Sequence, residues 1–298
     1  MFLPIMDVSV SPRPEGESYN VQMSQSLLDI LALIFEFKIS AAWHIARFIS
    51  QKDQSKYLQL KLRRMWQAGL LESLQIYAGT RLGMPIYYML SKLGLKTLAE
   101  QAHYDKIRIK MYPTPTSFIS SGLFKHDAQI VELASLEAMN RSDKLLITFT
   151  GETGAMTREN RSDKNIEVLT PDYIVDYIIN GITERVYSEF ERTNKSASAM
   201  IRKIERYRQY FWPGEEKQKT LRLVFQTSNM EEAFWLNILT NKPSLLQRLR
   251  VITTNVPLLE KPEKFLEAVY AVESTVTFKR EGRLMAEVKG RVKMFDFL

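Results

Sequence analysis

TPDYIVDYIINGITERVYSEFERTNKSASAMIRKIERYRQYFW, residues 170–212, is the stretch that decides the fold of this chain. Asn180 and Gly181 stand between two runs rich in β-branched and aromatic residues, 173–179 and 182–190. An Asn-Gly pair between two such runs favours a two-residue type I′ turn. The stretch therefore predicts a β-hairpin.

The register of this hairpin brings acidic residues together. If Ile179 pairs with Ile182, Asp172 falls opposite Glu189, with Cβ atoms roughly 4.5 to 5.5 Å apart. Glu191 lies two residues further along and shares the face of Glu189. Like charges placed opposite each other destabilise a sheet, so we expect a positive partner such as Mg²⁺ or Mn²⁺ between the carboxylates. The alternative is an ordinary solvated hairpin face.

A basic helix is expected after the second strand. Apolar residues recur at helical spacing from Met200 to Phe211, and Pro213-Gly214 ends the pattern. The helix carries Lys203 among several arginines.

The N-terminal part of the sequence predicts three helices followed by a hairpin, which is the element order of a winged helix. Helices are expected from Ser26, from about Ser40 and over residues 53–68, followed by a hairpin over 70–90 and a closing helix. The third helix is expected to bury Leu58, Leu62, Met65 and Trp66 and would enter the major groove of DNA. The outward residues expected to contact DNA are Lys56, Gln59, Arg63 and Arg64, with Arg81 at the hairpin tip on a phosphate. The alternative is a winged helix used for protein contacts.

These patterns predict an α/β (α+β) chain of two domains. The second domain needs a mixed sheet, because strands alternate with helices after the hairpin. Residues 111–122, MYPTPTSFISSG, break both periodicities and predict the linker. The expected divisions are a flexible arm over 1–24, the winged helix over 25–110, the linker over 111–122, and the second domain with a basic tail over 123–298.

Composition narrows the function classes. The chain of 298 residues has no cysteine and 3 histidines, which excludes a disulfide framework, a thiolate zinc site and a cysteine nucleophile. Its net charge of +7 suggests a polyanionic partner. No apolar run is long enough to span a membrane and no signal peptide is recognisable, so we expect a cytoplasmic protein. Gly151-Glu152-Thr153-Gly154 lacks the lysine of a phosphate-binding loop, which argues against an NTPase.

Three short motifs carry a resemblance to a known family. Pro171-Asp172, then Glu189-Phe190-Glu191, then a helix with Lys203-Ile204 and Tyr207, resembles the core of PD-(D/E)xK nucleases. With a winged helix in front, the order resembles the plasmid replication-relaxation proteins, and among them the MOB-C relaxases, which nick plasmid DNA at a transfer origin. The resemblance covers about residues 25–255.

The resemblance implies metal-dependent cleavage of double-stranded DNA at a plasmid transfer or replication origin, with relaxosome or replication proteins as further partners. Asp172 and Glu189 would hold Mg²⁺ or Mn²⁺, and Glu191 would ligate the ion or orient the attacking water. Glu191 occupies the slot where the nuclease core usually has its lysine. Lys203 is the first choice for the catalytic lysine and Lys195 the second.

Water is the simpler nucleophile for such a core, although many relaxases attack with a tyrosine. The tyrosines near the motifs are Tyr173, Tyr177, Tyr187, Tyr207 and Tyr210. A non-catalytic DNA-binding regulator of plasmid replication or transfer is the alternative function, and a plain transcriptional repressor is a third.

Overall fold

The structure is a computed structural model, and its described part has a mixed α/β fold, as the sequence predicts. It describes residues 7–13, 22–77, 85–101, 106–158, 170–210, 220–241, 249–259, 261, 263–267, 270–271, 277–280 and 283–286. The chain forms two compact units. The first contains residues 1–139 and 151–158, and the second contains residues 140–150 and 159–298.

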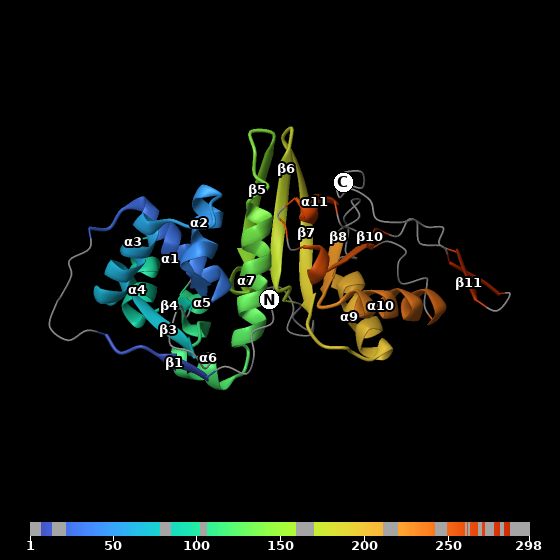
Figure 1. Cartoon of the computed structure of the whole chain (residues 1–298), viewed down its shortest axis with the longest axis horizontal. Helices are drawn as coiled ribbons and strands as arrows, with labels where there is room; N and C mark the ends of the chain where they lie inside the picture. Colours follow the sequence, from blue (N-terminus) through green and yellow to red (C-terminus); the bar gives the residue numbers. More distant parts are fainter. Residues whose placement is uncertain are drawn as a thin grey trace. The chain divides into compact units, whose positions relative to one another are not determined.

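The first unit is a group of helices beside a small sheet (Figure 1). The sheet has four strands in the order β1-β3-β4-β2. These strands are β1 (Asp7–Val10), β2 (Ser40–Ala41), β3 (Leu71–Tyr77) and β4 (Ile86–Leu90). The helices are α1 (Gln25–Phe37), α2 (Ala42–Ser50), α3 (Lys56–Gln67), α4 (Lys92–Gln101), α5 (Lys106–Met111), α6 (Pro115–Ser120), α7 (Phe124–Ala138) and α8 (Glu152–Arg158).

The core of the first unit follows the predicted helical periods. In α3, Leu58, Leu62 and Met65 are buried, as expected from their spacing. The N-cap residue Ser55 accepts a hydrogen bond from the N–H of Leu58, which fixes the start of this helix. Gly94 of α4 lies so close to the backbone of Leu70 that an added Cβ would stand 2.1 Å from the carbonyl oxygen. The closing helix therefore packs directly against the turn that follows α3.

Two expectations about chain organisation need correction. Residues 7–10 of the expected flexible arm form β1, which pairs antiparallel with β3. The alternating sequence Asp7–Val10 suits a strand, and β3 would otherwise present an open edge. Residues 115–120 of the expected linker form α6, because Thr114 caps this helix and Pro115 occupies its first turn, where proline is tolerated.

The first unit also extends beyond the predicted linker, because α7 packs on α2. The link is the carboxylate of Glu132, which accepts hydrogen bonds from Trp43 Nε1 (3.0 Å), His44 Nε2 (2.7 Å) and Arg47 Nη1 (2.7 Å). Nδ1 of the buried His44 accepts from the N–H of Ala41, so the ring carries its proton on Nε2. Residues 152–158 form α8.

The second unit is built on a six-stranded sheet in the order β10-β9-β8-β7-β6-β5. Strands β7, β8 and β9 are parallel to one another, whereas β6 runs antiparallel to β7 and β10 antiparallel to β9. The bounds are β5 (Leu145–Gly151), β6 (Tyr173–Ile179), β7 (Ile182–Glu191), β8 (Thr220–Phe225), β9 (Arg250–Asn255) and β10 (Tyr270–Ala271). The predicted mixed sheet is present.

The hairpin of β6 and β7 has the predicted register. Ile179 pairs with Ile182 and Tyr173 with Ser188. Asn180 and Gly181 have φ angles of 53° and 80°, which are the positive values that a type I′ turn requires. Local turn chemistry therefore determines which residues of the two strands face each other.

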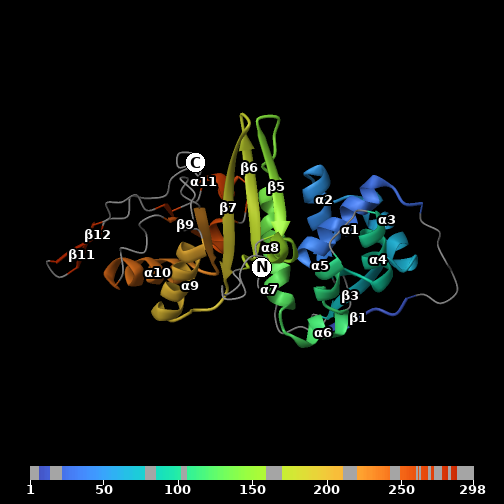
Figure 2. The ribbon, with the colours of Figure 1, turned by 180° about the vertical axis from the view of Figure 1, so that it is seen from behind.

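Two helices cover one face of this sheet (Figure 2). They are α9 (Ala197–Tyr210) and α10 (Ser228–Asn241), which pack against each other. Side chains of α9 reach Glu189, side chains of α10 reach Thr253, and these two residues flank Leu223 in the register of the parallel strands. Both helices therefore lie over the face that carries Glu189.

The remaining elements are short. They are the 3₁₀ helix η2 (Val256–Leu258), α11 (Lys264–Glu267) and the hairpin of β11 (Thr277–Arg280) with β12 (Arg283–Ala286). Across the described ranges, no helix has the length and apolar character needed to cross a bilayer.

Candidate functional site

Asp172 lies just before β6 and faces the end of β7. Its Oδ2 accepts a hydrogen bond from the backbone N–H of Phe190 at 2.6 Å. One step beyond the Tyr173–Ser188 pair, the register places Asp172 opposite Glu189. Besides burial, the charge of Asp172 also raises the pKa of Glu189, so the two carboxylates lie near each other as predicted.

Glu189 and Glu191 share one cationic partner, Lys203 of α9. Its Nζ lies 2.5 Å from Oε2 of Glu189 and 2.5 Å from Oε1 of Glu191. Both glutamates are buried, with 7% and 1% of their surfaces exposed. The ammonium group therefore bridges two carboxylates that water scarcely reaches.

Two further side chains complete this cluster. The hydroxyl of Tyr207, one turn after Lys203 on α9, donates to Oε1 of Glu189 at 2.5 Å. Lys195, in the connection between β7 and α9, places its Nζ 2.7 Å from Oε2 of Glu191. Both lysines proposed for catalysis thus contact Glu191, but only Lys203 also contacts Glu189. We call Asp172, Glu189, Glu191, Lys203 and Tyr207 the carboxylate cluster.

Burial and charge act against each other within the carboxylate cluster. Burial alone would lower the pKa of Lys203, but Glu189 and Glu191 outweigh it and raise that pKa above its usual value. Burial also raises the pKa of Glu189, and the opposing effect of Lys203 is smaller. Lys203 therefore keeps its proton, and the carboxylates depend on it for charge balance.

The positive partner expected between the carboxylates is thus supplied by the chain itself. Carboxylate oxygens are ligands that hard divalent cations prefer, so Asp172 and Glu189 are chemically suitable ligands for Mg²⁺ or Mn²⁺. In the described ranges, however, no three acidic or histidine side chains are grouped as a ready metal site. The proximity of the carboxylates therefore does not by itself require a metal ion.

The tyrosines considered as nucleophiles are mostly inaccessible. Tyr173, Tyr177, Tyr187 and Tyr207 are each 2% exposed or less. A phosphodiester of DNA cannot approach hydroxyls buried to this degree. This burial favours water as the nucleophile over these tyrosines.

A second polar network, which the sequence did not predict, occupies the opposite face of the sheet. Arg222 of β8 is 1% exposed and donates from Nη2 to the hydroxyls of Tyr173 (2.9 Å) and Ser188 (2.8 Å), and from Nη1 to that of Tyr177 (3.2 Å). Arg222 therefore joins β8 to β6 and β7 on the face of the sheet opposite Glu189. An isolated arginine in an apolar strand is the only sequence signal for this network.

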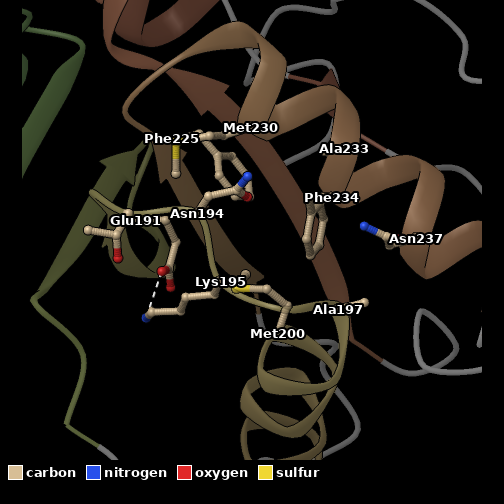
Figure 3. A pocket seen from close by; sticks show the side chains of 11 residues that line it. Glu191, Asn194, Lys195, Ala197, Met200, Phe225, Met230, Ala233, Phe234 and Asn237 are labelled. Carbon is tan, nitrogen blue, oxygen red and sulfur yellow. Dashed lines mark ion pairs between the residues drawn. The ribbon is translucent and has the colours of Figure 1, made fainter.

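A small pocket opens beside the carboxylate cluster (Figure 3). Glu191 and Lys195 line one side, and Phe234 and Asn237 of α10 line the other. Its volume of about 20 Å³ has room for about one water molecule. The pocket thus leaves room for a water molecule next to Glu191.

The residues proposed to contact DNA lie on the surface of the first unit. Lys56, Gln59, Arg63 and Arg64 are all exposed on α3, as predicted from their spacing. Arg81 lies outside the described residues. The exposed face of α3 is available to a partner.

Comparison with known proteins gave one match. The family model described as Replication-relaxation matches residues 31–223, which is more than half of the chain. This range includes α3 and every member of the carboxylate cluster. No curated protein and no solved structure matches the chain.

Proposed function

This chain belongs to the replication-relaxation family, and we propose that it is a metal-dependent nuclease that nicks plasmid DNA at a transfer or replication origin. The observation that carries the proposal is the carboxylate cluster, in which Lys203 contacts both Glu189 and Glu191 while Asp172 lies opposite Glu189. Two carboxylates and a lysine are the kinds of group that the PD-(D/E)xK resemblance implies, although here the lysine comes from α9 and Glu191 stands in its usual position.

The proposed chemistry divides among the residues of the cluster. Asp172 and Glu189 would hold Mg²⁺ or Mn²⁺, which when bound lowers the pKa of water and neutralises phosphate charge. Glu191 borders the small water-sized pocket and orients the attacking water. Lys203 stabilises the charge that develops on the phosphate. Tyr207 holds Glu189 in position through its hydrogen bond.

The first unit would bring DNA to this chemistry as a winged helix. Three helices, α1 to α3, are followed by the antiparallel pair β3 and β4, which is the element order of that fold. The exposed basic residues of α3 support its placement in the major groove. Further partners would be relaxosome or replication proteins.

A non-catalytic regulator is the second candidate, and one observation favours it. Lys203 forms ion pairs with both Glu189 and Glu191, so these carboxylates have a structural role that does not depend on catalysis. In that case the second unit would serve partner contacts, and the first unit would still bind DNA.

The test is cleavage of supercoiled plasmid that carries the candidate origin. We expect the unmodified protein to produce open circles with Mg²⁺ or Mn²⁺ and none with EDTA. Asp172→Asn should abolish nicking without loss of fold, because Asn can still accept the hydrogen bond from Phe190. The matched control is Asp176→Asn, which alters a carboxylate of β6 that pairs with Arg185 outside the cluster.

Binding is measured separately, because the two candidates differ only in cleavage. Arg63→Ala combined with Arg64→Ala should weaken origin binding and reduce its salt dependence. Tight origin binding with no metal-dependent nicking would leave the regulator as the function. Normal nicking by Asp172→Asn would remove the carboxylate cluster from the reaction.

A further inference from the structure

The exposed face of α3 carries two large apolar side chains among its basic residues. Tyr57 is 74% exposed and Leu60 is 58% exposed. Single exposed apolar residues are common on protein surfaces, but these two are neighbours on one helix face.

Leu60 occupies the middle of this face. At 100° per residue, it lies almost diametrically opposite the buried residues Leu58, Leu62 and Met65. Lys56 precedes it by one turn and Arg63 follows it by one turn. A helix that inserts into a groove places the middle of its exposed face deepest, whereas the flanking residues reach the groove walls.

The charge of α3 is entirely positive. The helix sequence KYLQLKLRRMWQ contains lysines and arginines but no aspartate or glutamate. Such a surface is complementary in charge to a polyanion. A surface that binds another protein would be expected to carry both positive and negative side chains. The charge complementarity therefore selects DNA as the occupant of this face.

Tyr57 lies in the first turn of α3, where Lys61 approaches its ring. Lys61 Nζ lies 5.9 Å from the centre of the Tyr57 ring and donates to Ser26 Oγ of α1 at 2.5 Å. The N-terminal residues of a recognition helix are those that contact base edges.

We propose that Leu60 and Tyr57 determine sequence specificity by contacting thymine methyl groups in the major groove, while Lys56, Arg63 and Arg64 contact phosphates. The inference rests on the proposed DNA-binding role of the first unit. The thymine methyl is the one apolar group that base pairs present in the major groove, and apolar side chains recognise it there. The preferred site therefore contains thymines at fixed positions.

The test uses full-length protein and a duplex selected from a randomised library. Each thymine of the selected duplex is replaced in turn by deoxyuridine, which removes only the methyl group. We expect replacement at one or two positions to weaken binding about 3- to 10-fold, the effect of exposing one methyl group. Fluorescence anisotropy with labelled duplex measures each Kd at fixed salt.

Variants identify the side chains responsible. Leu60→Ala should bind the selected duplex about 10-fold more weakly and lose the sensitivity to deoxyuridine at one position, and Tyr57→Ala should lose it at another. Both variants should bind an unrelated duplex as the unmodified protein does, because phosphate contacts remain. Leu93→Ala, at a comparably exposed leucine of α4 (48% exposed), is the matched control and should change nothing.

Distinct outcomes separate this inference from the proposed function. Binding of all duplexes without preference, or a deoxyuridine pattern unchanged in Leu60→Ala and Tyr57→Ala, overturns the inference while leaving DNA binding intact. Absence of binding to any duplex at low salt overturns the DNA-binding role of the first unit and, with it, this inference.

Discussion

Replacing Lys203 by methionine is the most direct perturbation of the carboxylate cluster. Methionine keeps an unbranched stem of similar length and removes only the ammonium group, so Glu189 and Glu191 lose the cation that lies 2.5 Å from each. Removing one partner of a buried ion pair costs about 3 to 5 kcal/mol. Because 21% of the Lys203 side chain is exposed, water screens part of the loss, and we expect about 3 kcal/mol.

The assay is thermal unfolding followed by circular dichroism. A loss of about 3 kcal/mol corresponds to a decrease in Tm of about 6 to 12 °C for a domain of this size class. Adding Glu189→Gln and Glu191→Gln to the methionine variant should restore most of the stability, because the uncompensated charges disappear. Arg202→Met, at an exposed neighbour on α9, should change Tm by less than about 2 °C.

The same variant tests metal binding without measuring cleavage. If the cluster holds a divalent cation, Mg²⁺ or Mn²⁺ should stabilise Lys203→Met by about 2.7 kcal/mol at 100 times the Kd. The variant that also carries both glutamines should gain much less. An unchanged Tm in Lys203→Met would refute the charge-balance argument, and equal metal effects on the two variants would refute cation binding by these carboxylates.

Two more predictions concern single side chains. Tyr207→Phe removes the hydrogen bond to Glu189, so we expect a stability loss of about 1.5 to 3 kcal/mol in urea unfolding and slower nicking with an unchanged Kd for DNA. His44 is buried and burial lowers its pKa, so the unfolded state binds a proton below pH 6.5 that the folded state does not; stability should therefore fall with decreasing pH by up to about 1.4 kcal/mol per unit. The groups that surround His44 are Glu132, Arg47, Trp43 and Tyr87. Burial raises the pKa of Asp127 to about 6, so this carboxyl takes up a proton in the folded state and makes stability rise as the pH falls. Urea unfolding of the unmodified protein and of His44→Gln at several pH values isolates the contribution of the histidine. If the free energy of unfolding changes with pH equally in both proteins, His44 is not the group responsible.

Several features were predictable because they depend on neighbouring residues. Asn180-Gly181 determines a turn, the turn determines the register, and the register places Asp172 opposite Glu189. The apolar spacing of α3 likewise determines which of its residues are buried and which basic residues are exposed. Intrinsic turn geometry and helical periodicity are sufficient for both.

Other features required knowledge of which surfaces meet. The sequence of residues 7–10 predicts a flexible arm, and only the pairing with the edge of β3 makes this segment a strand. Helix α7 belongs to the first unit because Glu132 contacts side chains of α2 more than 80 residues earlier in the chain. The proline-containing segment before α7 was interpreted as a linker, although Pro115 starts a helix.

The sequence by itself determined the three carboxylates and their common hairpin face, because strand pairing and alternation are local rules. Only the tertiary structure decided their partner, because α9 must fold back over the sheet before Lys203 can lie between Glu189 and Glu191. The same is true of Arg222, whose hydroxyl partners come from β6 and β7. Charge balance in a buried cluster depends on distances between segments remote in sequence, and these distances are set by how the helices pack on the sheet.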